Sequence, residues 1–322
     1  MKDKLIKNVW VLAALFAVGC TSNPLEVPVD VEANRPVFHP FHIDFFDTTQ
    51  SIEDLRGEYA PFLTSEVPDA VWDERRTNSF FTALNADVQQ VFPSMEPMEN
   101  EIAEVLAHYR YYYPERYLPE IYTYVSGADV SYPIIDADSM AFIALDIFLG
   151  ADHPAYAEVP QYIRRRFTPD YLPVKFAAEL ADRHVQWNPT DLTLLNSMIY
   201  WGKIAYFIEA MAPDLAPEIL HEYTPEEERW AEEFETEIWG YLLAQDLLFD
   251  QRTDTRNRFV EEAPFSKFYA GIDRESPGRI GRWLGWRIVH SYMKNHSVSL
   301  PELMRDTDHR TLFNKSNYKP HG

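Results

Sequence analysis

The chain has 322 residues, 46% hydrophobic and 15% aromatic, which suffices for one large globular domain and excludes a largely disordered chain. Its formal net charge of −22 at pH 7 disfavours nucleic acid and anionic lipid surfaces as partners, because both would repel it. A single cysteine allows no intramolecular disulfide and no cysteine-based zinc site.

The amino-terminal residues, MKDKLIKNVWVLAALFAVGC, combine a basic start with a short apolar run that ends at Cys20. Lys2, Lys4 and Lys7 supply the positive charge. The apolar run over residues 9–18 is shorter than the ~20 residues that a membrane-spanning helix needs. This pattern predicts a signal peptide over residues 1–19.

The end of this segment, Ala17-Val18-Gly19-Cys20, resembles the lipobox of bacterial lipoproteins. The resemblance implies that the thiol of Cys20 receives a lipid and that the chain is cleaved before it. The alternative is an ordinary signal peptide with an accidental cysteine. Because the only cysteine stands where the modification needs it, we expect an acylated, flexible tether over residues 20–38. The protein would then be lipid-anchored in the cell envelope, in the inner or the outer membrane, and face the periplasm.

Residues 39–322 are expected to form a single globular domain that is mostly helical. Residues 99–113, for example, place Ile102, Val105 and Tyr109 at helical spacing before Pro114. Residues 121–125, 130–135 and 140–145 are instead rich in β-branched and aromatic side chains and predict three strands. The predicted fold class is therefore α+β, predominantly α-helical with a small antiparallel sheet.

The second half of the domain is predicted to be helical. Residues 170–185 form one helix, and residues 191–211 form another that is apolar nearly all round, which is typical of a buried central helix. Lys203 lies in this second helix. A buried lysine must be paired or neutralised, so Lys203 is either a member of a structural ion pair or a functional amine.

Two further helix features are visible. Thr224 and Pro225, followed by three glutamates, predict a helix start, because the threonine caps and the acids meet the positive helix end. A last long helix is predicted from Gly278 to about residue 294. Gly278, Gly281 and Gly285 share one face of it, where we expect close packing against another helix or the end of a bound peptide.

Catalytic motifs are incomplete or missing. His221 and Glu222 begin like the HExxH of zinc peptidases, but the fifth position is Pro225, which also prevents a continuous helix. A Gly-x-Ser-x-Gly elbow, a P-loop and a dinucleotide fingerprint are absent. We therefore expect no catalytic residue, no metal and no cofactor.

One alternative to that expectation remains open. A metal-dependent hydrolase would need ligands such as Asp146, Asp152 and His153 or His184.

The stretch from residue 258 to residue 292 is unusually dense in arginine, aromatic and glycine residues. It packs either as a structural network of arginine–carboxylate pairs or as a groove that recognises a partner segment. The residues assigned to this groove or network are Lys203, Lys267, Asp273, Arg274, Glu275, Arg279, Arg282 and Arg287.

Two segments of this stretch, APFSKFY at 263–269 and DRESPGRIGRWLGW at 273–286, resemble the gliding-motility lipoprotein GldB family of Bacteroidetes-type bacteria. Similar segments are YTYVSGADVSYPII at 122–135, ALDIFLG at 144–150, MIYWGKIAYF at 198–207 and SNYKP at 316–320. The resemblance implies a lipoprotein linked to gliding and its associated secretion machinery, with no established enzymatic activity. Its partners would be the membrane, through the lipid anchor, and other proteins of that apparatus.

The order of elements is also similar to that of HExxH peptidases, in which one helix holds two histidines and the next a glutamate. Residues 170–185 would be the first of these helices, but they contain no HExxH, and Trp201 stands where many relatives are expected to carry an acid. This implies a degenerate peptidase-like fold that has lost its metal site. We expect a non-catalytic accessory or scaffold protein; the alternatives are a hydrolase or a peptide-binding module derived from such a fold.

Overall fold

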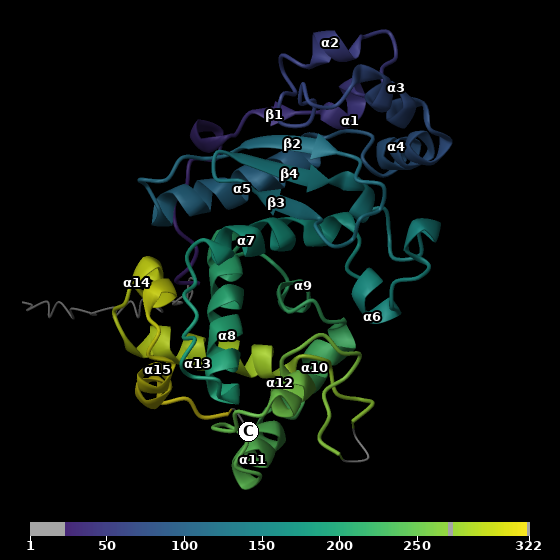
Figure 1. Cartoon of the computed structure of the whole chain (residues 1–322). Helices are drawn as coiled ribbons and strands as arrows, with labels where there is room; N and C mark the ends of the chain where they lie inside the picture. The colour runs from purple at the N-terminus through teal and green to yellow at the C-terminus, as the bar shows by residue number, and fades with distance from the viewer. Residues whose placement is uncertain (1–22, 270–272, 321–322) are drawn as a thin grey trace, which may run out of the picture.

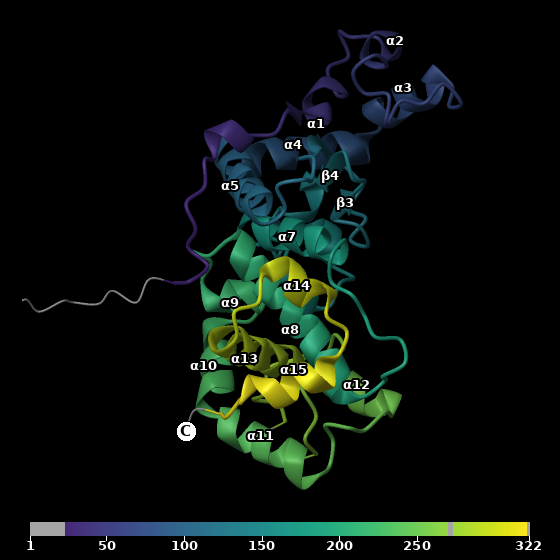
Figure 2. The same ribbon diagram turned by 90° about the vertical axis from the view of Figure 1, so that its left-hand side faces the viewer.

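The structure, a computed structural model, describes residues 23–269 and 273–320. The predicted signal peptide and Cys20 lie outside these residues. A sheet with helices α1–α5 forms one end of the molecule, helices α8–α15 form the other, and α7 lies between them (Figure 1). Figure 2 shows the same two parts from the side, stacked along the long direction of the molecule.

The secondary structure follows the chain in this order. The strands are β1 (Phe38–His39), β2 (Glu120–Tyr124), β3 (Ile134–Asp136) and β4 (Met140–Ala144). The α-helices up to residue 211 are α1 (Phe41–Asp44), α2 (Ile52–Leu55), α3 (Asp69–Thr77), α4 (Ser79–Val91), α5 (Glu96–Tyr112), α6 (Gln161–Arg164), α7 (Leu172–Asp182) and α8 (Leu194–Met211). They are followed by α9 (Pro217–Leu220), α10 (Pro225–Glu233), α11 (Glu235–Ala244), α12 (Thr253–Phe259), α13 (Ile280–Asn295), α14 (Leu300–Arg305) and α15 (His309–Ser316). Short 3₁₀ helices are η1 (Glu32–Asn34), η2 (Leu145–Ile147), η3 (Pro154–Tyr156) and η4 (Pro169–Tyr171).

The sheet of the described residues has four strands in the order β1-β2-β4-β3 and is mixed. β1 pairs with β2 and β2 with β4 in parallel, and only β3 and β4 run antiparallel. The α+β class is confirmed, but the prediction of an antiparallel sheet was wrong for its central pair. The carboxylate of Asp146, just after β4, accepts hydrogen bonds from the amides of Ser126 (2.8 Å) and Gly127 (2.9 Å), just after β2. This contact holds the carboxyl ends of β2 and β4 side by side, as a parallel pair requires.

The described end of the predicted tether packs on the domain. Leu25 is only 5% exposed and belongs to the main hydrophobic core. The Arg35 guanidinium donates to the side chain of Asn100 in α5 (2.6 Å), and Phe38 pairs with Ile121 of β2. The expectation of a flexible tether up to residue 38 is therefore corrected, because residues 23–38 contribute to the folded structure.

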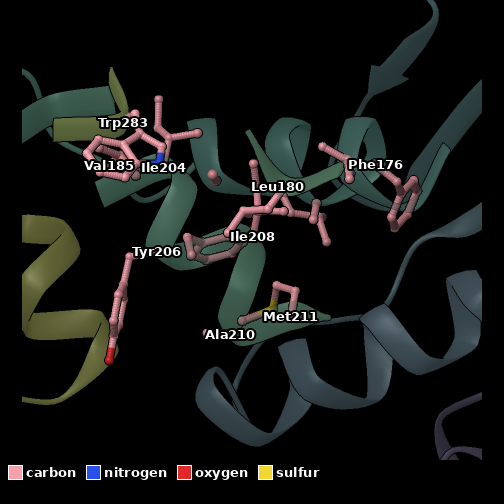
Figure 3. Packing of buried hydrophobic residues seen from close by; sticks show 14 of the residues in the cluster. Phe176, Leu180, Val185, Ile204, Tyr206, Ile208, Ala210, Met211 and Trp283 are labelled. Carbon is pink, nitrogen blue, oxygen red and sulfur yellow. The ribbon is translucent and has the colours of Figure 1, made fainter. Parts of the chain in front are cut away.

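Helix α8 is the central helix that its composition predicts. Most of its residues are buried, and it packs against α7 and α13. Figure 3 shows part of this core, with Phe176 and Leu180 of α7 and with Ile204, Ile208 and Met211 of α8. Within the part of the chain that the structure describes, no helix combines the length and the hydropathy needed to cross a membrane.

Helices α8 and α13 approach each other through glycines. A Cβ atom added to Gly285 of α13 would overlap the carbonyl oxygen of Met198, and one added to Gly202 of α8 would overlap the carbonyl group of Gly285. Gly281 lies where a Cβ atom would come within 2.8 Å of the Phe259 carbonyl oxygen. The predicted packing of a glycine face against another helix is confirmed for Gly285.

Candidate functional site

A cavity of about 440 Å³ opens between α7 and α8 and reaches the start of α13. Its size is that of sites that take a small molecule or a few side chains of a partner. Much of its wall is apolar and comes from α7, α8 and α13. Apolar lining residues are Val174, Ala178, Ile204, Ala205, Ile208 and Trp283. The charged lining residues are Lys175, Glu222, Glu261, Glu262, Arg279 and Arg282.

The backbone between α9 and α10 turns Glu222 into this cavity. Helix α9 ends at Leu220, and Glu222 adopts the left-handed conformation with φ of 56°, which is uncommon for a residue with a side chain. Helix α10 then begins at Pro225 with the predicted cap, in which Thr224 and Glu227 bond reciprocally to each other's backbone amides. Pro225 and this cap separate the two helices, as the sequence predicts.

Glu222 is the centre of a buried ionic cluster. Its carboxylate contacts the Arg279 guanidinium (2.7 Å), the Arg166 guanidinium and the Lys175 ammonium group, while the residue is only 8% exposed. Burial alone would raise the pKa of Glu222, but the charges of Lys175, Arg166 and Arg279 outweigh burial and hold it well below its ordinary value. Glu222 is therefore an ionised acceptor with little basicity.

A second carboxylate, Glu262, binds the other side of the same arginines. It lies 3.1 Å from the Arg166 guanidinium and 3.4 Å from that of Arg279. Burial raises the pKa of Glu262, but the charges of Arg279, Arg166 and Arg282 lower it by more. The pKa of Glu262 therefore lies below its ordinary value. Four cationic side chains meet two carboxylates here, with the exposed Glu261 at the cavity wall as a third, while burial lowers the pKa of Lys175.

Arg282 is the least closely paired cation of the cluster. Its guanidinium lies over the Trp201 ring, 3.7 Å from the ring centroid, and its Nε donates to the Val260 carbonyl oxygen (2.6 Å). The nearest carboxylate oxygen of Glu262 is 3.9 Å away. Burial and the neighbouring Arg279 lower the pKa of Arg282 to about 10. Trp201, which stands where an acid was expected, thus supports a cation at the cavity wall.

His221 connects the cavity to a buried polar pair. Its Nδ1 lies 2.9 Å from the Glu228 carboxylate, which also accepts a hydrogen bond from the indole N–H of Trp283 (2.9 Å). Its ring packs edge-on against Trp286, with centroids 4.6 Å apart. Across residues 23–269 and 273–320, no three His, Cys, Asp or Glu side chains are grouped as a metal site would need.

The ligands of the alternative metal-dependent hydrolase are used elsewhere. Asp146 is fully buried and accepts backbone amides after β2, as described above. His153 lies 3.1 Å from Asp87, Asp152 is exposed, and the Nε2 atom of His184 is 2.9 Å from the Tyr109 hydroxyl. The structure does not bring these residues to one site.

The residues assigned to a groove or network fall into separate places. Arg279 and Arg282 lie together at the cavity. Lys203 is fully buried, but its ammonium donates to the carbonyl oxygens of Met304 (3.1 Å) and Asp306 (2.8 Å). The ion pair that was one of the two alternatives for Lys203 is thus replaced by backbone acceptors, and burial lowers the pKa of Lys203 to about 8.

The remaining predicted residues stabilise a loop or lie on the surface. Asp273 accepts hydrogen bonds from the amides of Phe268 (2.9 Å) and Tyr269 (3.1 Å) and so fixes the backbone at these two residues. Residues exposed on the surface are Lys267, Arg274 and Glu275. Arg287 binds Glu235 (3.0 Å) on another face of α13.

Sequence reasoning missed four members of the cluster, Arg166, Lys175, Glu222 and Glu262. The sequence held a signal for two of them, Arg166 and Lys175. Three successive arginines, 164–166, are unusual in a chain this acidic, and Lys175 is the one cationic residue of the otherwise apolar start of α7. Glu222 was considered only as part of an incomplete metal motif.

The comparisons with known proteins agree with the resemblance seen in the sequence. No curated protein and no solved structure matches the chain significantly. The family model described as gliding motility protein GldB matches residues 23–320, which is nearly the whole chain and includes every residue of the cavity. The chain therefore belongs to the GldB family of gliding motility proteins.

Proposed function

We propose that this GldB-family chain is a non-catalytic accessory or scaffold component of the gliding apparatus and its associated secretion machinery. Lipid on Cys20 would hold it in the cell envelope, facing the periplasm. The observation that most directly supports a binding role is the cavity between α7 and α8, where apolar walls meet a buried cluster of charged side chains. Arg282, the least closely paired cation of this wall, provides a contact for a partner segment that presents a carboxylate beside an apolar side chain.

The electrostatics of the cavity favour binding over chemistry. A general base works best when its pKa lies near the working pH. The pKa values of Glu222 and Glu262 are both lowered by surrounding cations, so at neutral pH both carboxylates are weak bases. They serve better to hold Arg166 and Arg279 in place than to accept a proton from water.

Among the alternatives, the same cavity supports a peptide-binding module over a hydrolase. Helix α7 presents Val174, Lys175 and Ala178 to the cavity, where a zinc peptidase with this order of elements would carry its histidines. Helix α8 contributes Trp201, which holds Arg282. Both helices thus provide contacts for a bound segment.

The first test removes the anchor in living cells. A clean deletion is expected to abolish colony spreading, and full-length protein supplied from a plasmid to restore it. A Cys20→Ser variant should fail to restore spreading and should leave the membrane fraction, because the hydroxyl cannot take the thiol's place in lipid transfer. A Ser22→Ala variant is the matched control and should behave as the wild type. Normal spreading with Cys20→Ser would refute the need for an anchor, and normal spreading of the deletion mutant would refute the motility role.

The second test fills the cavity while leaving its ionic cluster intact. Ala205 of α8 lines the cavity, so Ala205→Trp should occupy the space that a partner segment needs. We expect loss of colony spreading with an unfolding midpoint close to the wild type. Ala244→Trp places the same side chain at an exposed position of α11 and should leave spreading unchanged. Full spreading of a folded, membrane-bound Ala205→Trp protein would contradict a binding role for this cavity.

A further inference from the structure

A second cavity, of about 380 Å³, lies beyond the carboxyl end of α7, where the ends of α5, α7 and α14 meet. Three arginines from three segments line it: Arg116, which follows α5, Arg183 at the end of α7, and Arg305 at the end of α14. Arginines are common at helix carboxyl ends, because the partial negative charge there stabilises a cation. This preference does not explain why three such arginines share one cavity that has room for a small organic molecule.

Two of these arginines are available to a ligand. Arg183 is bound by Asp136 and by Asp138 (3.0 Å). Arg116 and Arg305 are exposed, and within the described residues neither forms an ion pair. The acidic residues near them, Glu115 at the cavity wall and Glu302 one turn earlier in α14, are exposed as well.

A buried charge lies behind the cavity wall. The Lys203 ammonium donates to Met304, to Asp306 and, at 3.5 Å, to the carbonyl oxygen of Gln186, and Gln186 itself lines the cavity. All three acceptors are neutral carbonyl groups. A buried ammonium without a carboxylate in direct contact leaves positive potential on its surroundings, and an anion in the adjacent cavity would offset it.

Two stacked rings, Tyr113 and His184, form part of the cavity wall. Tyr113 stacks on His184 with ring centroids 3.9 Å apart, and its hydroxyl is buried without a hydrogen-bond partner in the described part of the chain. Burial, followed by the charges of Arg116, Arg183 and Arg305, lowers the pKa of His184 to about 4. His184 is therefore neutral at pH 7, with burial as the main cause of its low pKa and the three arginines as the second.

We propose that this cavity binds a small organic oxyanion, whose carboxylate or phosphate group pairs with Arg116 and Arg305. Arginine suits both groups because its planar guanidinium donates two parallel hydrogen bonds. Tyr112 and Tyr113 provide flat walls for an apolar body attached to the anion. This proposal is independent of the cavity between α7 and α8 and of the motility role.

Calorimetry on the full-length protein in detergent tests it with three probes that share one ring. Benzoate presents a carboxylate, phenyl phosphate presents a phosphate, and benzamide is neutral. We expect saturable binding of at least one anion, and the stronger of the two identifies the group that the site prefers. Binding of benzamide should be at least ~10-fold weaker, because it lacks the charge. The proposal fails if neither anion binds saturably, or if benzamide binds as well as benzoate.

Variants locate the binding. Arg116→Ala and Arg305→Ala should each weaken the bound anion by ~10-fold or more, since a hydrogen bond to a charged group contributes roughly that much. Both side chains are exposed, so the fold should survive, which thermal unfolding checks. Arg229→Ala, at an exposed arginine of α10, is the control and should bind as the wild type. Unchanged binding in both Arg116→Ala and Arg305→Ala would overturn the proposal.

Discussion

Replacing Glu222 by glutamine is expected to lower the free energy of unfolding by about 3–5 kcal/mol at pH 7, the cost of removing one partner from a buried ionic group. Glutamine has nearly the same shape but no charge, so Arg166, Lys175 and Arg279 would remain buried around a neutral amide. The mutual repulsion of these three cations would then be opposed only by Glu262. Urea unfolding followed by tryptophan fluorescence measures the loss.

The pH dependence separates this charge effect from a packing defect. The folded-state pKa of Glu222 lies well below 4.5, the ordinary value of a glutamate side chain. The stability that its ionisation contributes is therefore present above pH 4.5 and lost as the pH falls through the folded-state pKa. The stability difference between wild type and Glu222→Gln should be constant near neutral pH and shrink below pH 4.5. A difference that stays the same at low pH would contradict the electrostatic account.

Two further substitutions provide the scale for this experiment. Glu226→Gln changes an exposed carboxylate of α10 and should leave the free energy of unfolding close to that of the wild type. Glu262→Gln removes the more exposed partner of the same arginines and should cost less than Glu222→Gln. It remains measurable if Glu222→Gln prevents folding. Equal stability of wild type and Glu222→Gln at pH 7 would show that the cluster is not coupled to folding.

Local features of the sequence predicted local structure well. The helical period in residues 99–113, the apolar composition of residues 191–211 and the cap at Thr224 correspond to α5, α8 and the start of α10. Each of these signals is contained within about one helix, and the physics that it reports, burial of one face or bonding of the first amides, acts over the same distance.

Strand pairing could not be predicted in the same way. The three strand segments were recognisable by composition, but the partner of each strand is decided by contacts outside the strand. The bonds from Ser126 and Gly127 to Asp146 join residues 20 and 19 positions apart and set β2 parallel to β4. Of the predicted strand over 130–135, only its end became β3 (Ile134–Asp136).

The members of the candidate site were even harder to predict from the sequence than the strand pairing. Arg166 lies 56 positions from Glu222 and 96 positions from Glu262, and nothing in the sequence says which of its 51 acids each arginine will meet. Arg279 and Arg282 were recognisable because they stand in a dense run of arginines and glycines. Lys203 was recognised as buried, but its acceptors are backbone carbonyl groups, which carry no sequence signal at all.

The contact between α8 and α13 gives the other large expected effect. Gly285→Ala should destabilise the fold by about 3 kcal/mol or more, because the new methyl group would overlap the backbone of Met198 and helices can separate only by losing core contacts. This loss outweighs the gain of about 1 kcal/mol that alanine provides over glycine inside a helix. Thermal and urea unfolding measure the difference.

Gly240→Ala in α11 is the matched control, since no atom lies within 4 Å of the position that its Cβ would take. There the helix propensity acts alone and should stabilise the protein by about 0.5–1 kcal/mol. The two substitutions are chemically identical and should have opposite signs. If Gly285→Ala also stabilised the protein, the helices could not be packed as closely as the structure has them.

Gly285→Ala should also affect the cavity between α7 and α8. Arg279 and Arg282 stand at the start of α13, and Trp201, which supports Arg282, stands in α8 beside Gly202. A methyl group between the helices would therefore move Arg282 relative to Trp201 as well as reduce stability. A Gly285→Ala protein that still folds should lose colony spreading to a greater extent than an equally destabilised variant elsewhere in the core, such as Leu312→Ala in α15. Equal spreading of the two variants would mean that the helix pair supports the fold alone and not the cavity.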